Sequence, residues 1–280
     1  MDGSGMSNLE RRYRRLLGVL PRWYRQDREE EMVGIFLADR TDDLDLEHGW
    51  PGWGETWAVL GLAVRTHLAA GAALGGGVRW RGEVVRALGM IGLLVGLLQA
   101  GASVTGSGLS GPGSGMLVLN LVPVAAFVAL LAGKRTTAKV LAFVAVATGL
   151  LLGPLMGTWL LFQLPAVVTF ACLCLGFHRE APTPPAGRLA WWGGGALLLG
   201  LVAGPWLGTV AVIAVLVVVR VVALVRGDFV LGRALSLFAV LELGPVVLLL
   251  LSGTVFAVAL VLMALLVVSA VAPVRRPQFS

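Results

Sequence analysis

From Val84 onward the chain consists of long apolar runs separated by short polar gaps. An α-helix needs about 17–25 mostly apolar residues to cross the hydrocarbon core of a bilayer, and most of these runs have that length. The pattern predicts an all-α polytopic membrane domain over residues 83–274, followed by a tail at 275–280. The eight predicted transmembrane helices lie at about residues 85–105, 116–133, 138–156, 158–177, 189–206, 208–225, 234–251 and 254–272.

The charges in the gaps predict which side of the membrane each gap faces. Basic residues follow the second, fourth, sixth and eighth runs, in GKRTTAK, HREAPTPPAGR, RGDFVLGR and VRRPQFS. The alternate gaps, around GSGLSGPGSG, GPLMGT, PWLGT and LSGT, carry no charge. Because cytoplasmic loops are enriched in Lys and Arg, we expect a multi-pass protein of the cell (inner) membrane with both termini in the cytoplasm.

Short repeated motifs predict how the runs are grouped. GLLLGPLMGT at 149–158 matches GLVAGPWLGT at 200–209, and a Gly-Thr pair opens the fourth, sixth and eighth runs. A fixed spacing between similar segments is typical of tandem structural repeats. We therefore expect four tandem helical hairpins, each with a Gly/Pro turn outside and a basic turn inside.

Residues 1–82 follow a different pattern and predict a small cytoplasmic helical domain, which we call the head. Apolar residues at helical spacing predict a first helix from Asn8 to about Leu20. Pro21 suits the first turn of a second helix, which we expect to run to about Ala38, because a proline lacks the N–H that is unsatisfied there.

A third helix is predicted from Glu55 to about Leu74, and it is nearly apolar enough for a span. As a span it would place Arg65 and His67 near the bilayer centre, where a charged side chain costs about 2.5 kcal/mol or more. We expect this helix instead to pack on the head or to lie at the membrane surface. The tryptophans in and around this helix suit the membrane interface; they are Trp50, Trp53, Trp57 and Trp80. The core of the head is an equally good place for the first three.

The overall charge of +6 does not indicate nucleic-acid binding once its location is considered. Residues 1–48 hold 8 Lys and Arg against 11 Asp and Glu, whereas the remainder holds 14 against 5. The excess base therefore lies between the apolar runs, where it reports on topology. The composition, 57% hydrophobic and 14% charged, indicates the lipid bilayer as the main partner.

Two ionisable residues fall inside predicted spans, Arg220 in the sixth and Glu242 in the seventh. Both would lie roughly 9–14 Å inside the inner boundary, so we expect an ion pair across the hairpin. Two interpretations stay open: a structural pair that fixes two helices, or a proton or ligand site. Three further polar side chains at depth are expected to form interhelical hydrogen bonds; they are Gln99, Asn120 and Gln163.

The sequence carries no motif that predicts catalysis, a cofactor or a metal centre. Cys172 and Cys174 are two residues apart on a predicted helix and do not face each other, so we expect no disulfide between them. With His178 they give an incomplete set of metal ligands. We expect a protein that is not an enzyme.

The head resembles a known family along the run Arg11-Arg12-Tyr13-Arg14-Arg15-Leu16-Leu17, then Leu20-Pro21, Tyr24-Arg25 and Glu29-Glu30-Glu31-Met32. This run is similar to the N-terminal segment of actinobacterial membrane proteins of the HAAS type (helix-turn-helix-associated α-helical signalling domain). The resemblance implies a cytoplasmic signalling module coupled to a membrane sensor or permease, often linked to a PadR-like transcriptional regulator.

We therefore expect an integral membrane signalling protein whose head binds such a regulator. Its contact residues would be the charged and aromatic residues of the first two helices, Arg11, Arg12, Arg14, Arg15, Tyr24, Glu29, Glu30 and Glu31. A transporter or permease subunit for a small or hydrophobic compound is the alternative, and a scaffold is a third. A homo-oligomer is compatible with each of them.

Overall fold

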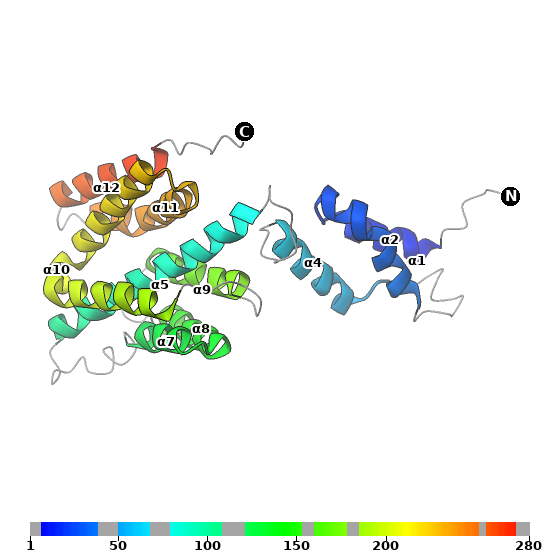
Figure 1. The fold of residues 1–280 in the computed structure, drawn as a ribbon, viewed down its shortest axis with the longest axis horizontal. Coiled ribbons are helices and arrows are strands. Elements are labelled where there is room, and N and C mark those ends of the chain that lie inside the picture. Colours follow the sequence, from blue (N-terminus) through cyan, green and yellow to red (C-terminus); the bar gives the residue numbers. More distant parts are fainter. Residues whose placement is uncertain are drawn as a thin grey trace. The chain divides into compact units, whose positions relative to one another are not determined.

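The computed structural model describes residues 7–38, 50–67, 79–107, 121–152, 160–177, 185–251 and 256–272. These residues are helical apart from short turns, and no strand occurs among them (Figure 1). Their contacts divide the chain into two compact units. The head is Met1–Gly82, and Glu83–Ser280 is called the apolar unit.

The described part of the head contains the helices α1 (Asn8–Leu17), α2 (Arg22–Ala38) and α4 (Trp53–His67). Helix α1 begins after Ser7, whose side chain accepts a hydrogen bond from the Glu10 N–H at 3.1 Å. It ends three residues before the predicted Leu20, because the chain turns at Gly18. Helix α2 is described as far as Ala38, the predicted end, and the next residues lie outside the described part. For α4 the predicted residues 68–74 lie outside the described residues.

All three helices contribute to one apolar core in the head. Tyr13 of α1 stacks on Phe36 of α2, with ring centroids 3.9 Å apart and the planes 5° from parallel. Helix α4 adds Val59 and Ala63 to this core. It therefore packs on the head, which is one of the two arrangements expected from the sequence. Of the two alternatives for the tryptophans in and before α4, burial in this core does not occur, because all of them are more than half exposed; they are Trp50, Trp53 and Trp57.

The apolar unit is helical throughout its described part. Its elements are α5 (Arg79–Ser107, whose first turn belongs to the head), α7 (Val122–Leu131), α8 (Arg135–Leu152), a 3₁₀ turn η2 (Leu160–Gln163), α9 (Leu164–Gly176), α10 (Ala186–Arg226), α11 (Phe229–Leu251) and α12 (Phe256–Val271). Each of the eight predicted runs therefore coincides with a helix where it is described.

Four stretches are long and apolar enough to cross a membrane; they are Trp80–Thr105, Ala186–Gly204, Leu207–Arg226 and Phe229–Leu248. Crossing by all eight stays a prediction.

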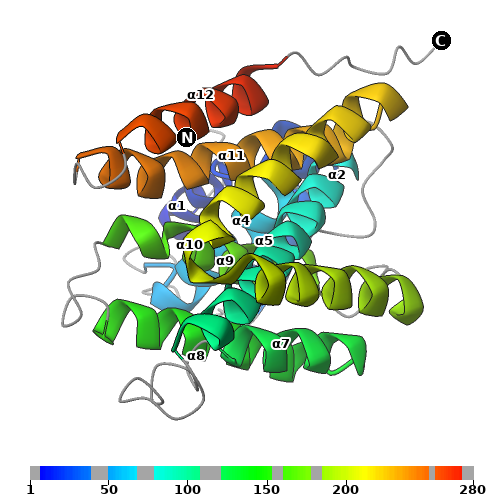
Figure 2. The same ribbon diagram turned by 90° about the vertical axis from the view of Figure 1, so that its left-hand side faces the viewer.

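Helix α5 runs through the middle of the apolar unit (Figure 2). Its residues Met90, Leu93 and Leu97 form a core with residues of α7, α8, α9 and the first part of α10. The second part of α10 packs with α11 and α12 to form a three-helix group. Both groups are thus connected through α10.

A sharp bend divides α10 where the sequence predicts two spans joined by a turn. Gly204 has φ 64° and ψ −178°, a conformation essentially restricted to glycine. Pro205 follows and cannot donate a helical hydrogen bond, so the two halves of α10 run in different directions (Figure 1). The predicted gap is therefore a bend within one helical element.

Helices α5 and α10 approach each other closely enough for their backbones to touch. A Cβ on Gly200 would lie 2.0 Å from the Leu98 carbonyl oxygen, and a Cβ on Gly101 would lie 2.4 Å from the Leu197 carbonyl oxygen. Both obstacles are backbone atoms and cannot rotate away. Small residues on facing helices are how membrane helices gain close packing.

We expect Gly200→Ala to destabilise the protein by about 2 kcal/mol or more, because the new methyl group forces the two helices apart. Gly194→Ala on the same helix is the matched control, since a Cβ there has nothing within 4 Å. The control should be neutral or stabilising, because alanine favours a helix by about 1 kcal/mol over glycine. Thermal unfolding of the detergent-purified proteins measures both, and equal midpoints would contradict the close approach.

Candidate functional site

A buried arginine connects the three helices α10, α11 and α12. The Arg220 side chain on α10 is only 2% exposed. One guanidinium nitrogen donates to the Gly232 carbonyl near the start of α11, and the other donates to the Ala272 carbonyl at 2.7 Å, at the end of α12. The last carbonyls of a helix lack partners within it, so a cation suits this position.

A serine completes this arrangement. The Ser236 hydroxyl lies 3.1 Å from the Gly232 carbonyl oxygen and 3.2 Å from the Ser269 carbonyl oxygen of α12. We call Arg220, Gly232, Ser236, Ser269 and Ala272 the Arg220 cluster. It joins three helices through charged and neutral hydrogen bonds. Ser236 was not among the residues predicted from the sequence, although a hydroxyl inside an apolar run is itself a signal of interhelical bonding.

A tight turn sets the register between α10 and α11. Gly227 adopts φ 65° and its N–H bonds back to α10, ending that helix. Asp228 then caps α11 by accepting from the Leu231 N–H at 2.9 Å. The turn brings Gly232 within reach of Arg220, so the Gly-Asp pair of RGDFVLGR determines the position of the Arg220 cluster.

The predicted ion pair between Arg220 and Glu242 is wrong. The guanidinium bonds the carbonyl of Gly232, and Glu242 lies ten residues further along the same helix, which is about 15 Å. One side chain cannot reach both positions. The prediction compared only how deep the two α-carbons lie in the membrane. The Arg220 side chain extends toward the turn between α10 and α11, away from Glu242.

Glu242 is therefore a buried carboxyl group of its own. It lies on the buried stripe of α11, together with Leu235, Ala239 and Val246, and is 6% exposed. Its Oε1 has no hydrogen-bond partner in the described structure, nor does the Nε of Arg220. An unsatisfied buried polar atom in an apolar helix needs an explanation, and such residues commonly mark functional sites in membrane proteins.

The other polar residues predicted at depth do not form one site. Gln99 is exposed on α5, so it does not lie between helices as expected. Gln163 is half-buried and packs against α8, where its amide occupies the space that a Cβ on Gly149 would need. Asn120 lies outside the described residues, as does His178. Cys172 is buried, Cys174 is exposed, and both are free thiols on α9.

The charged residues predicted as a partner surface in the head divide into two groups. The first group holds α1 and α2 together. Arg14 forms two bonds to the Glu30 carboxylate at 2.7 and 2.9 Å and one to Glu10 of its own helix at 3.0 Å, and Glu29 lies 3.7 Å away. This two-pronged geometry is the stronger kind of ion pair. Arg28 and Glu31 pair separately on α2 at 2.8 Å, as their spacing suggests.

The pKa values follow from these contacts. The hydrogen bonds from Arg14 lower the pKa of the Glu30 carboxyl group, and those of Glu30 and Glu10 raise the pKa of Arg14. Burial, and next the nearby carboxylate of Glu55, raise the pKa of Tyr13. We call Arg14, Glu10 and Glu30 the Arg14 network. Its charged side chains hold α1 against α2 at neutral pH.

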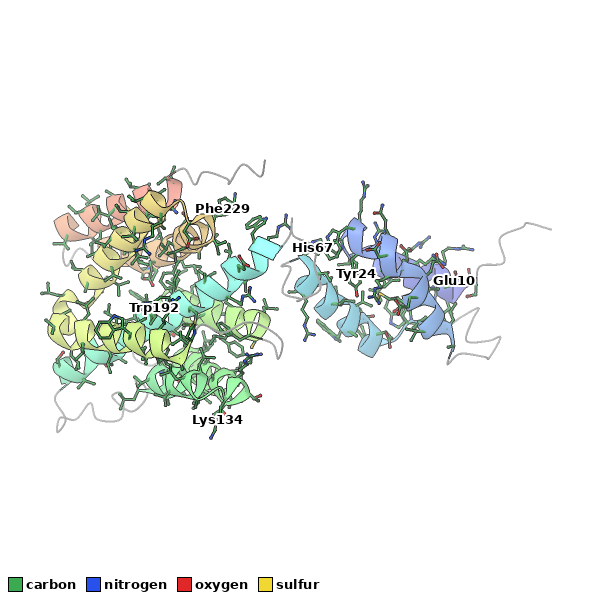
Figure 3. The ribbon with its side chains drawn as sticks, in the orientation of Figure 1. Glu10, Tyr24, His67, Lys134, Trp192 and Phe229 are labelled. Atoms are coloured by element: carbon green, nitrogen blue, oxygen red, sulfur yellow. The ribbon has the colours of Figure 1, made fainter. Side chains whose placement is uncertain are left out.

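The second group is exposed. Arg11, Arg12 and Arg15 are exposed on α1, and Arg11 and Arg15 lie opposite its buried residues Leu9, Tyr13 and Leu17. Tyr24 is instead packed partly against the core and meets the Trp23 ring edge to face at 5.6 Å (Figure 3). The structure thus brings Arg14, Glu29 and Glu30 together and leaves an arginine face on α1.

Comparisons with protein-family models, curated proteins and solved structures find no match to this chain. The resemblance of the head to the HAAS type therefore stays a prediction. The interpretation of the chain depends on the geometry of the Arg220 cluster, of Glu242 and of the head.

We expect Arg220→Met and Glu242→Gln to have additive effects on stability, with a coupling energy below about 0.5 kcal/mol, because the two side chains do not interact. Arg220→Met with Ser236→Ala is the positive control. Those two residues share the Gly232 carbonyl and should couple more strongly. Unfolding of the single and double variants in detergent gives both values. A large coupling energy between positions 220 and 242 would show that the two residues form an ion pair after all, since breaking a buried pair costs about 3–5 kcal/mol.

Proposed function

We propose that the chain is an integral protein of the cell membrane, with eight spans in four hairpins, and that its cytoplasmic head passes a signal to a soluble partner. The partner class is a PadR-like transcriptional regulator, as the head's resemblance implies. The four long apolar helices and the alternation of basic and uncharged gaps support the membrane location and the topology.

The arginine face of α1 is the observation that carries the proposed partner contact. Arg11 and Arg15 are one helical turn apart, exposed, and on the opposite side from the core of the head. The Arg14 network holds α1 against α2, so the face is presented on an ordered pair of helices. Exposed positive charges on an ordered frame favour association with an acidic surface.

Contacts inside the head connect this face to the beginning of α5. Arg81, in the first turn of α5, donates to the His67 carbonyl at 3.3 Å, and the His67 ring nitrogen lies 2.9 Å from the Val19 carbonyl oxygen in the turn between α1 and α2. Helix α5 continues without a break to Ser107, through the core of the apolar unit.

A transporter is the second candidate, and Glu242 is the observation that favours it. A buried carboxyl group with an unpartnered oxygen is suited to bind a proton or a cation. The bend at Gly204 supplies a place where a helix could move. The apolar character of the neighbouring buried residues on α11 counts against a polar pathway.

The test is binding of the full-length protein, in detergent, to the purified PadR-like regulator of the same organism. We expect Arg11→Glu and Arg15→Glu each to weaken binding about tenfold, because each removes one favourable charge and adds a repulsive one. Arg22→Glu is the matched control: Arg22 is exposed at the start of α2 and undergoes the same change of charge.

Equal binding by all four proteins, or none by the unmodified chain, would contradict the proposed contact. Glu242→Gln separates the two candidates. If it abolishes uptake or efflux of a compound and leaves regulator binding unchanged, the chain is a transporter. If it leaves both unchanged, Glu242 takes no part in either function.

A further inference from the structure

Helix α4 has two apolar sides, and the head covers only one of them. Val59 and Ala63 are buried in the core of the head, and Thr66 on the same side of the helix is buried as well. Roughly opposite, Trp53, Trp57 and Val64 follow one another at spacings of four and seven residues and are 71%, 67% and 48% exposed. At about 100° per residue these three side chains form one stripe along the helix. We call them the α4 stripe.

We infer that the α4 stripe lies in the headgroup region of a lipid bilayer, so that α4 is an interfacial helix holding the head on the membrane surface. The inference depends on the membrane location proposed above and is independent of the regulator.

The chemistry of the stripe fits this environment. An indole ring is apolar but carries one N–H, and tryptophan is enriched where acyl chains meet headgroups. Arg65 follows Val64 and is exposed beside the stripe, where a cation can contact anionic headgroups. Two mostly exposed tryptophans one helical turn apart would otherwise face water at considerable cost.

Chain connectivity keeps α4 close to the bilayer. Eleven residues, 68–78, separate the end of α4 at His67 from the start of α5 at Arg79. Even when fully extended, this connection is only about 40 Å long. The candidate span in α5 begins at Trp80, so the α4 stripe is always within reach of the membrane surface.

The exposed area argues against a second protein molecule as the occupant. At about 250 Å² for a whole tryptophan, the exposed parts of Trp53 and Trp57 amount to roughly 350 Å². A stable protein–protein interface buries about 800 Å² on each partner. Even with the half-exposed Val64 added, the stripe stays well below that area. An interfacial helix needs only a narrow apolar side inserted about 5–10 Å deep.

Spin labels on the full-length protein test the inference. In a Cys172→Ala, Cys174→Ala background, one label is placed at Val64→Cys on the stripe. The control label is placed at Ala58→Cys, which is exposed and about 120° away around the same helix. Both proteins are reconstituted in nanodiscs of phosphatidylethanolamine and phosphatidylglycerol. The accessibility of each label to oxygen, which dissolves in lipid, is compared with its accessibility to a water-soluble nickel complex.

We expect the oxygen-to-nickel ratio to be severalfold higher at position 64 than at position 58. Adding Trp53→Ser and Trp57→Ser should lower the ratio at 64, and both residues lie outside the head's core, so the fold is retained. Equal, water-like ratios at 58 and 64 would overturn the inference. Spin–spin broadening at 64 with low access to both reagents would also overturn it, by showing a second copy on the stripe. No regulator is present, so a failure here leaves the binding test of the arginine face untouched.

Discussion

The apolar unit depends on how closely its helices approach α5. Inside a bilayer the hydrophobic effect does not drive helices together, because lipid is as apolar as leucine, so close packing must supply the free energy. At Gly101 and Gly200 the backbones of α5 and α10 touch. Gly92 of α5 leaves room for the Thr169 side chain of α9, and Gly96 leaves room for the ring of Pro123 on α7. One glycine-lined helix thus allows three neighbours to pack directly against it.

The Arg220 cluster holds α10, α11 and α12 together, as the glycines allow helices to pack around α5. There the free energy comes from hydrogen bonds to carbonyls of α11 and α12 in place of backbone contact. A guanidinium is suited to this because its several N–H groups reach two carbonyls at once. Glu242, which lies outside this cluster, is left as a buried carboxyl group that packing alone does not account for.

The sequence predicts the helices well and their contacts less well. Apolar run length is a local property, and for this reason each predicted run coincides with a helix where it is described. The wrong pairing of Arg220 with Glu242 shows what local patterns lack, since side-chain direction decides which groups meet. From Gly89 to Gly106 the glycines of α5 recur at spacings of three to five residues, so the sequence did contain a signal for the central helix. The exposure of Trp53 and Trp57 had no such signal, because an aromatic residue on a half-apolar helix suits a core equally well.

The central claim is that these helices cross a bilayer in alternating directions, with the basic gaps on the side of the head. Reporter fusions after Gly111 and after Arg135 test it most directly, because a single predicted span separates the two positions. Alkaline phosphatase, active only outside the cytoplasm, should be active at Gly111 and inactive at Arg135, and a fluorescent protein that matures only in the cytoplasm should give the reverse. The same reporter active at both positions would contradict the account.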